Sequence, residues 1–311
     1  MFFLIPFLFF IVISAMVLGM RTAVEGLANL SGKGWVQRFL SRPIHPLYGL
    51  AAGIISTVIV QSSSAVTMIA VGLVSSGILP LRGAVPFVFG ANIGTTLTVQ
   101  MLAHAPETLG WYLAFAGWFL WFALPLQASL GKVLAGFGLI FVGLNLLDLM
   151  LPPLAERMWF VRLIELMSAD PWSAFFSGVL LTTLLMSSTV TIGIIQRLAD
   201  RGLISVVEAL PMLYGDNVGT TTDTLMVSIG AKTAGRQLAL IHLLFNLVGS
   251  AFFWLLTPLF ADLLQWLSQD PARQLAHAHF LFNLISAFVQ LPLIDGYLGL
   301  TRRIVRPGAG A

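Results

Sequence analysis

The sequence contains no cysteine and very little charge. Of its 311 residues, 9% are Asp, Glu, Lys or Arg and 58% are hydrophobic, whereas soluble domains carry about a quarter charged residues. The absence of cysteine excludes disulfides, thiolate metal sites and a cysteine nucleophile. The low charge excludes a water-soluble globule and predicts an all-α polytopic membrane protein.

The basic residues do not form a nucleic-acid-binding face. The net charge is +3 and the isoelectric point is about 9.6, but Lys and Arg are scattered near the ends of apolar segments, where they can anchor helices at the membrane surface. The sequence also shows no paired catalytic carboxylates, no metal-ligand cluster and no nucleophile motif. We therefore expect no nucleic-acid partner, no enzymatic activity and no cofactor.

The N-terminal segment lacks the positive charges and the small-residue cleavage site of a signal peptide. We interpret residues 2–20 as the first membrane helix, in a multi-pass protein of the cell membrane, which in a bacterium is the inner membrane. Aromatic and basic residues at 21–46 and 152–170 predict short interfacial helices. Further ordinary helices are expected near residues 111–128, 133–151, 237–260 and 275–299.

The chain contains an internal repeat. Residues 53–98 match residues 178–223 without a gap, at a shift of 125 residues. Apolar matches could arise from membrane composition, but identical polar and conformationally special residues also coincide: Thr57 with Thr182, Ser62 with Ser187, Ser63 with Ser188, Gly77 with Gly202, Pro86 with Pro211, and Asn92 with Asn217. We predict membrane repeats at 1–130 and 131–260, and a C-terminal membrane helix with a short tail at 261–311.

Each repeat has two short apolar segments separated by polar residues. Residues 47–60 and 65–79 would each be roughly 21 to 23 Å long as helices, which is less than the hydrocarbon core of about 30 Å. We predict a re-entrant helical hairpin at 47–79, with its tip at membrane depth, and a second one at 172–204. One continuous, strongly tilted helix is the alternative. The first tip consists of Gln61, Ser62, Ser63 and Ser64.

A run of glycine, asparagine and threonine follows each hairpin. Residues 90–96 are GANIGTT and residues 215–221 are GDNVGTT. Such residues favour irregular backbone over helix, so we predict one broken transmembrane helix at about 83–103 and another at about 206–230. Paired interrupted segments in the two halves of a chain indicate the central site of a secondary transporter.

The hairpin tips and the broken helices offer ligands for an anion and a cation together. Helix N-termini and hydroxyl donors suit a tetrahedral oxyanion, and neutral oxygens suit an alkali cation. The four motifs contain no Arg or Lys, so a co-bound sodium ion would offset the high cost of burying an anion. The predicted substrate-binding residues are Gln61, Ser62, Ser63, Ser64, Ser187, Ser188, Thr189, Asn92 and Asn217. The predicted sodium ligands are Gln61, Ser64, Asn92, Thr95, Thr96, Thr189, Asp216, Asn217, Thr220 and Thr221, with Asp223 as the fallback.

The two repeats differ where Asp216 replaces Ala91 and Met186 replaces Gln61. A carboxylate within a membrane segment is a functional candidate, so we expect Asp216 to be an ion ligand or a titrating group, with helix capping as the alternative. His242 and His279 begin the related sequences HLLFN and HFLFN. We interpret both as packing and interhelix hydrogen-bonding residues rather than proton carriers or substrate ligands.

These motifs resemble the signature of the sodium/phosphate cotransporter family. The resemblance rests on QSSSA at 61–65 and GANIGTT at 90–96, which return in altered form as MSSTV at 186–190 and GDNVGTT at 215–221, followed by HLLFN at 242–246. It implies two inverted-topology repeats whose re-entrant hairpins and broken helices line the substrate and sodium sites. It also implies a secondary active transporter that performs sodium-coupled symport of inorganic phosphate.

The expected partners are inorganic phosphate, the lipid bilayer, and sodium as the coupling ion. A carrier of another small oxyanion and a proton-coupled phosphate carrier are the alternatives to the phosphate symporter. A passive channel would share the wet central path but could not accumulate its substrate. Whether the protein forms a homo-oligomer is left open by the sequence.

Overall fold

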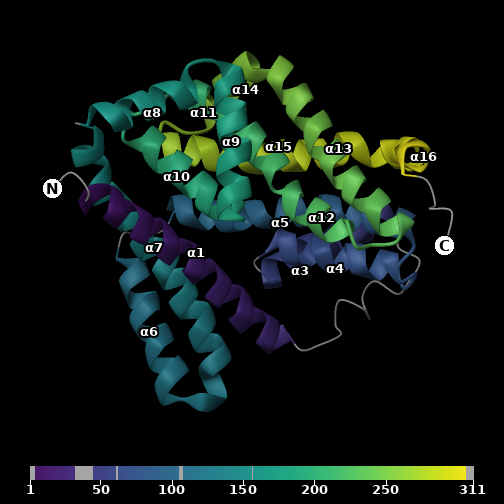
Figure 1. Ribbon diagram of the computed structural model, residues 1–311, viewed down its shortest axis with the longest axis horizontal. Coiled ribbons are helices and arrows are strands. Elements are labelled where there is room, and N and C mark those ends of the chain that lie inside the picture. Colours follow the sequence, from purple (N-terminus) through teal and green to yellow (C-terminus); the bar gives the residue numbers. More distant parts are fainter. Residues whose placement is uncertain (1–3, 32–44, 61, 105–107, 156, 306–311) are drawn as a thin grey trace.

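The computed structural model describes residues 4–31, 45–60, 62–104, 108–155 and 157–305. Every regular element in these stretches is a helix (Figure 1), which agrees with the all-α prediction. Three of the described helical stretches are long and apolar enough to cross a membrane: Pro125–Leu146, Thr233–Leu255 and Pro271–Ile304.

The first half of the chain contains five α-helices and a short 3-10 helix among the described residues. They are α1 (Leu4–Ser31), α3 (Pro46–Val60), α4 (Ser63–Ser75), α5 (Leu81–His104), α6 (Leu109–Ala123) and η1 (Pro125–Gln127). The interfacial helix expected at 21–46 falls mainly on residues 32–44, which lie outside the described part, while α1 continues to Ser31.

The second half repeats this order and adds helices at its end. Its elements are α7 (Ala128–Ala155), α8 (Met158–Ser168), α9 (Pro171–Leu185), α10 (Ser188–Asp200), α11 (Val206–Gly219), α12 (Thr221–Ser228), α13 (Thr233–Leu255), α14 (Thr257–Leu267), α15 (Pro271–Gln290), η2 (Leu291–Leu293) and α16 (Ile294–Ile304). α8 is the short helix expected within 152–170. Proline ends two of the predicted helices early: the segment at 237–260 divides into α13 and α14, and that at 275–299 into α15, η2 and α16.

Equivalent glycines make the turns that follow α4 and α10. Gly77 has a φ of 76° and Gly202 a φ of 67°, in the left-handed region that L side chains disfavour. After the second turn, Ser205 Oγ accepts a hydrogen bond from the Glu208 backbone N–H at 3.2 Å, and Glu208 Oε2 accepts one from the Ser205 N–H at 2.7 Å. This capping box starts α11 directly after the turn.

Glycines hold α3 against α5 and α9 against α11 in the same way. A Cβ atom at Gly90 would lie 2.0 Å from the Leu50 carbonyl oxygen, and one at Gly215 would lie 1.9 Å from the Phe175 carbonyl oxygen. Leu50 and Phe175 lie just before the matched ranges and differ by the same shift of 125 residues. The contacts advance along both helices of each pair in the same direction, so α3 runs parallel to α5 and α9 runs parallel to α11. The two halves therefore share one packing arrangement.

The broken helix predicted in the first half is wrong. α5 is one continuous helix from Leu81 to His104 and includes the whole of residues 90–96. The glycines of this run permit close helix packing rather than irregular backbone, since a Cβ atom at Gly94 would lie 2.7 Å from the Thr57 Cβ. In the second half the helix is interrupted only at Thr220, between α11 and α12, near the end of the predicted run.

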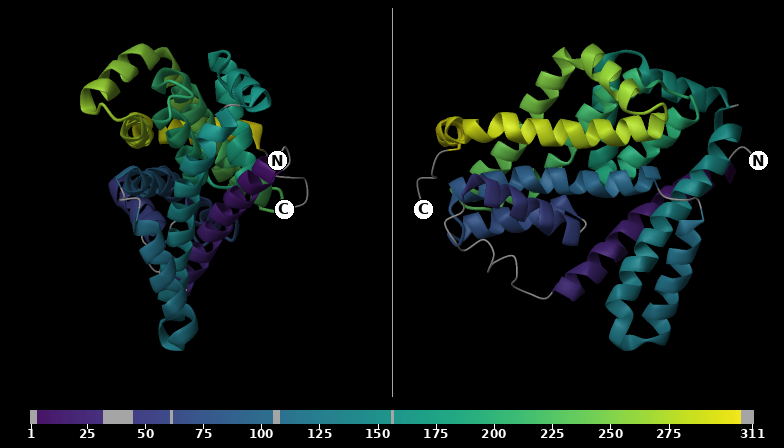
Figure 2. Two further views of the ribbon diagram at one scale, coloured as in Figure 1. Left: turned by 90° about the vertical axis from the view of Figure 1, so that its left-hand side faces the viewer. Right: turned by 180° about the vertical axis from the view of Figure 1, so that it is seen from behind.

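The helices α1, α6 and α7 form a group that projects from the rest of the molecule (Figures 1 and 2). α7 packs along both α1 and α6, again through glycines: a Cβ atom at Gly117 would lie 2.1 Å from the Ala135 backbone nitrogen. Lys132 of α7 forms an ion pair with Glu25 of α1. The remaining helices contain the predicted ligand residues.

Candidate functional site

Each predicted hairpin tip lies at the capped N-terminus of a helix, α4 or α10. The Ser62 hydroxyl oxygen accepts a hydrogen bond from the Ala65 N–H at 3.1 Å, and the Ser187 hydroxyl oxygen accepts one from the Val190 N–H at 3.3 Å. These pairs are equivalent in the repeat. Before the second tip, Met186 ends α9 in the left-handed region with a φ of 50° and is half exposed.

The other tip residues bring further hydroxyls to the same two helix ends. Ser63, Ser188 and Thr189 are buried, and Ser64 is half-buried. The first N–H groups of a helix have no partner within the helix, so each tip offers donors that suit an anion. Gln61, predicted as a ligand for both substrate and sodium, lies outside the described residues.

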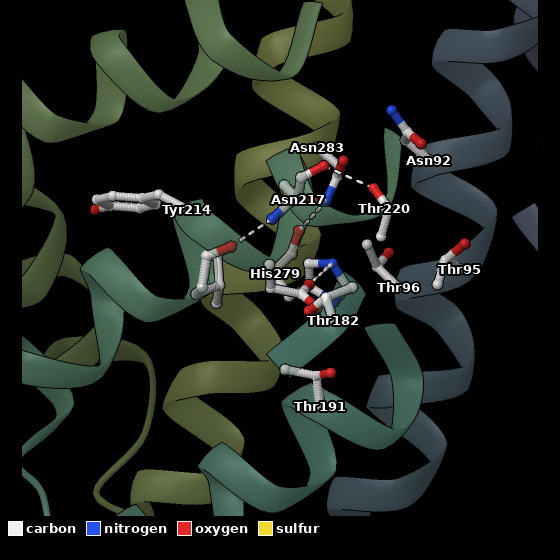
Figure 3. Close-up of polar contacts among 12 residues, drawn as sticks. Asn92, Thr95, Thr96, Thr182, Thr191, Tyr214, Asn217, Thr220, His279 and Asn283 are labelled. Carbon is white, nitrogen blue, oxygen red and sulfur yellow. Dashed lines mark hydrogen bonds and ion pairs between the residues drawn. The ribbon is translucent and has the colours of Figure 1, made fainter. Parts of the chain in front are cut away.

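A buried carboxylate occupies the centre of the second half. Thr182 donates its hydroxyl to Asp216 Oδ1 at 2.6 Å, and His279 Nε2 lies 3.9 Å from Asp216 Oδ2. Figure 3 shows Thr182 of α9 and His279 of α15 side by side at this point. Asp216 is 0% exposed, and its Oδ2 has no hydrogen-bond partner. A charge in such a place is costly unless a cation or a proton compensates it.

The neighbouring Asn217 is held by two directional hydrogen bonds. Its Nδ2 donates to the Leu213 carbonyl oxygen at 2.8 Å, and its Oδ1 accepts from Asn283 Nδ2 at 3.0 Å (Figure 3). Asn283 comes from the HFLFN sequence on α15 and is 0% exposed, with its Oδ1 unpaired. The second half therefore joins its GDNVGTT motif to a HFLFN residue through the bundle interior.

The first half makes the corresponding connection through histidine. Asn92 Oδ1 lies 3.1 Å from His242 Nε2, and the His242 Nδ1 lies 3.2 Å from the Thr224 hydroxyl oxygen. Thr224 in turn lies 3.0 Å from the Thr67 hydroxyl oxygen on α4. All four side chains are buried, and Asn92 Nδ2 has no hydrogen-bond partner. His242 thus makes the interhelix hydrogen bonds that the sequence predicted, whereas His279 has only the 3.9 Å contact with Asp216, and its Nδ1 has no hydrogen-bond partner.

We call the cluster around Asn92 the first half-site and the cluster around Asn217 the second half-site. They differ in charge although the helices that carry them pack alike. Where the second half has Asp216 beside Thr182, the first has Ala91 beside Thr57. The Thr57 hydroxyl has no hydrogen-bond partner, because the acceptor that serves its counterpart is absent. A full negative charge is therefore available in one half only.

The four predicted threonine ligands of the GANIGTT and GDNVGTT motifs share one hydrogen-bond pattern. Each donates its only hydroxyl proton to a backbone carbonyl one turn earlier in its own chain segment: Thr95 to Ala91, Thr96 to Ile93, Thr220 to Asn217, and Thr221 to Val218. Such a hydroxyl can no longer donate to an anion, but its oxygen can still bind a cation. The pattern fits their assignment as cation ligands rather than phosphate donors.

The close-up places residues from both halves in one region (Figure 3). Thr95 and Thr96 lie on α5, which packs against α10 and α15. The fallback ligand, Asp223, is buried in the first turn of α12, where a carboxylate interacts favourably with the helix dipole. The described residues contain no group of three or more His, Asp or Glu side chains placed to hold a metal ion, so a cation site among them would need neutral oxygens as further ligands.

Sequence reasoning missed several side chains of these clusters. Thr182 could have been found from its match with Thr57, and Asn283 from the repeated HLLFN and HFLFN sequences. Thr67 and Thr224 carried no signal, because each lies outside the motifs and gains its partner only through helix packing.

The sequence profile of the Na+/Pi-cotransporter family matches residues 15–148 and 155–287. The uncharacterized protein YqeW of Bacillus subtilis is 30% identical over 289 residues, which cover 92% of this chain and 94% of YqeW. YjbB of Escherichia coli, named as a candidate inorganic phosphate export protein, is 28% identical over 298 residues. Those residues cover 94% of this chain and 54% of YjbB, so the chain spans about half of that relative.

A mammalian relative matches over a shorter region. Sodium-dependent phosphate transport protein 2A of Oryctolagus cuniculus is 39% identical over 113 residues, which cover 33% of this chain and 18% of that protein. No solved structure matches the chain significantly.

Proposed function

We propose, because the chain belongs to the Na+/Pi-cotransporter family, that it carries inorganic phosphate across the membrane by sodium-coupled symport. The family consists of transporters, so the chain is not an enzyme. It is a membrane protein with apolar helices of spanning length. We place it, as part of the proposal, as a multi-pass protein of the cell membrane, which is the inner membrane in a bacterium.

The observation that carries the proposal is the pair of buried polar clusters around Asn92 and Asn217. The first cluster joins the GANIGTT motif of α5 to α13, and the second joins the GDNVGTT motif of α11 to α15. Each cluster retains unpaired buried polar atoms. Buried polar groups normally have partners, so unpaired donors and acceptors in motif residues support a site whose ligands complete them. Asn92 Nδ2 suits a phosphate oxygen, and Asp216 Oδ2 suits a cation.

Electrostatics support the coupling of the two ions. The tips supply helix N-termini and serine hydroxyls for phosphate, and the threonine hydroxyls and asparagine carbonyls supply oxygen ligands for sodium. Because the motif segments contain no Lys or Arg, a phosphate ion inside the bundle needs sodium as its counter-charge. Moving one net charge at about 100 mV supplies about 2.3 kcal/mol, which sustains roughly a 40-fold gradient.

We assign the helix pairs α3–α4 and α9–α10 to re-entrant hairpins in inverted-topology repeats. The short helices, each of 13 or 15 residues, support this assignment because neither alone is long enough to span the membrane. The shared glycine contacts of the two halves support a common ancestry of the repeats. In this arrangement the two tips enter the site from opposite sides.

We also propose that Asp216 is a sodium ligand of the second half-site. Its buried and unpaired Oδ2 supports this role more than capping does, because Asp216 lies in the interior of α11 rather than at its start. The first half has no equivalent charge, so the two half-sites bind their cations with unequal strength. Export is the second candidate for the direction of transport, and the name of YjbB favours it.

The deciding experiment measures labelled phosphate in proteoliposomes that contain the purified protein. We expect accumulation against the phosphate gradient when sodium flows in the same direction, no accumulation with potassium instead, and loss of transport in Asn217→Leu. Thr222→Val is the matched control, since Thr222 lies outside the proposed ligand set. Transport that is indifferent to sodium, or that only runs downhill, would refute symport. Gradients of both orientations distinguish import from export.

A further inference from the structure

A continuous row of buried polar atoms connects the first hairpin tip to Asn92. The Thr67 hydroxyl lies 3.1 Å from the Ser64 carbonyl oxygen and 3.0 Å from the Thr224 hydroxyl oxygen. The row continues through His242 to the Asn92 amide, at 3.2 Å and 3.1 Å. Ser64 and Asn92, at its two ends, are both predicted ligands of the transport site.

Proton counting restricts how this row can be bonded. Each threonine hydroxyl has one proton to donate, and a neutral imidazole has one N–H donor and one acceptor nitrogen. His242 is 1% exposed and forms no ion pair with the described part of the chain, so the neutral ring is the form that avoids an uncompensated buried charge. If the three contacts from Thr67 to Asn92 are all hydrogen bonds and Thr224 donates its proton within the row, these three bonds point the same way.

Two arrangements satisfy this condition. In the first, Thr67 donates to the Ser64 carbonyl, Thr224 donates to Thr67, His242 donates from Nδ1 to Thr224, and Asn92 donates its NH2 group to Nε2. The Asn92 carbonyl oxygen is then free. In the second, Thr67 donates to Thr224, Thr224 donates to Nδ1, and Nε2–H donates to the Asn92 oxygen. The Asn92 NH2 group is then free. The oxygen and nitrogen of an amide are nearly the same size, so one set of atom positions accommodates both arrangements.

We propose that His242 is a positioning residue that sets which end of the Asn92 amide faces the first half-site. The proposal rests on the sodium-coupled phosphate function. In the first arrangement Asn92 offers an oxygen to sodium, and in the second it offers N–H donors to phosphate. Thr67 lies in α4 and contacts the Ser64 carbonyl of the hairpin tip. A movement of the tip therefore selects which of the two hydrogen-bond arrangements forms. The same asparagine thus serves both ions, one at a time.

The second half-site lacks this freedom. Asn217 donates to the Leu213 carbonyl and accepts from Asn283, and Asn283 Nδ2 also donates to the His279 carbonyl at 3.0 Å. A carbonyl oxygen can only accept, so rotation of the Asn217 amide would break both of its bonds. Only the first half-site can therefore exchange donor for acceptor.

The variant Thr67→Val locks the row in the second arrangement. Without the Thr67 oxygen, His242 Nδ1 is the acceptor that remains for the Thr224 hydroxyl within the row, so we expect His242 to carry its proton on Nε2. Nitrogen-15 NMR of labelled histidine reports this tautomer, and His242→Gln identifies its signals. In sodium without phosphate, we expect wild type and Thr67→Ser to show the Nδ1–H form, and Thr67→Val to show the Nε2–H form.

Transport by the same variants separates this role from a general packing defect. Thr67→Val should raise the half-saturating sodium concentration about tenfold, since one sodium ligand is lost, while the KM for phosphate at saturating sodium stays within about twofold. Thr67→Ser and Thr222→Val should match the wild type. Identical tautomers in wild type and Thr67→Val, or equal rises in both constants, would overturn the proposal. If the wild type moves no phosphate, the proposed function fails, and the NMR comparison still decides the hydrogen-bond row.

Discussion

Removing the charge of Asp216 should weaken sodium coupling without unfolding the protein. Asp216→Asn keeps an oxygen that can accept the Thr182 hydroxyl, which now lies 2.6 Å from Oδ1. Asp216→Ala leaves that hydroxyl without an acceptor, but Thr57 already tolerates this condition beside Ala91 in the first half. Both variants should therefore insert and assemble normally.

The size of the effect follows from the burial of the carboxylate. Two unit charges about 4 Å apart attract by about 4 kcal/mol at an effective dielectric constant of about 20, and part of this is offset by the cost of keeping Asp216 buried at 0% exposure. A net loss of about 1.4 to 2.8 kcal/mol raises the half-saturating sodium concentration roughly 10- to 100-fold. The effect should be similar in Asp216→Asn and Asp216→Ala.

The assay is phosphate uptake into proteoliposomes over a range of sodium concentrations, with size-exclusion chromatography to check assembly. The reciprocal variant, Ala91→Asp, gives the unpaired Thr57 hydroxyl an acceptor and adds a charge to the first half. It should lower the sodium concentration needed for half-maximal uptake. Sodium curves that match the wild type in both Asp216 variants would show that the carboxylate is not an ion ligand.

Three further predictions concern packing, topology and capping. Gly90→Ala should prevent normal assembly, since its Cβ would lie 2.0 Å from a carbonyl oxygen of α3, whereas Gly72→Ala, with nothing within 4 Å, should leave thermal unfolding in detergent unchanged or slightly improved. Ser76→Cys and Arg201→Cys, at equivalent positions in a chain without cysteine, should react with an impermeant maleimide from opposite sides of the membrane, and labelling from one side alone would refute inverted topology. Hydrogen bonds, first from the Ser173 side chain, hold the pKa of Asp170 below its usual value. The ionised Asp170 therefore stabilises the folded protein fully at pH values above its unfolded pKa of about 3.9. This stabilisation is lost as the pH falls through the lower pKa of the folded state. Thermal unfolding of Asp170→Ala should accordingly approach that of the wild type at low pH and differ most near neutral pH.

The sequence predicted the repeat and the helix pairs because unusual residues carry that information. Proline, glycine and capping serine have few structural roles, so Gly77 and Gly202, or Ser62 and Ser187, in register are informative even in an apolar chain. The shared packing of the two halves follows from such positions. The departure at Asp216 was also visible in the sequence.

The errors arose where one residue type has two structural roles. The local sequence around Gly90 and Gly94 predicts a helix break, but α5 is continuous there and both glycines let its backbone pack against α3. A close neighbour cannot be inferred from a local pattern, so periodicity could not distinguish the two roles. Thr224 was missed for a related reason, since its importance comes from contacts with α4 and α13.

In both halves, the residues that set the helix packing are different from the residues that set the charge of the site. Gly90 and Gly215 fix how closely the helices approach, because a Cβ atom at these positions would lie 2.0 Å and 1.9 Å from a carbonyl oxygen. The adjacent positions, Ala91 and Asp216, are free of that constraint. A single base change converts an alanine codon into an aspartate codon. After duplication, one copy could therefore acquire a buried charge while the other kept its neutral site, and natural selection could adjust ion binding in one half of the protein without rebuilding its architecture.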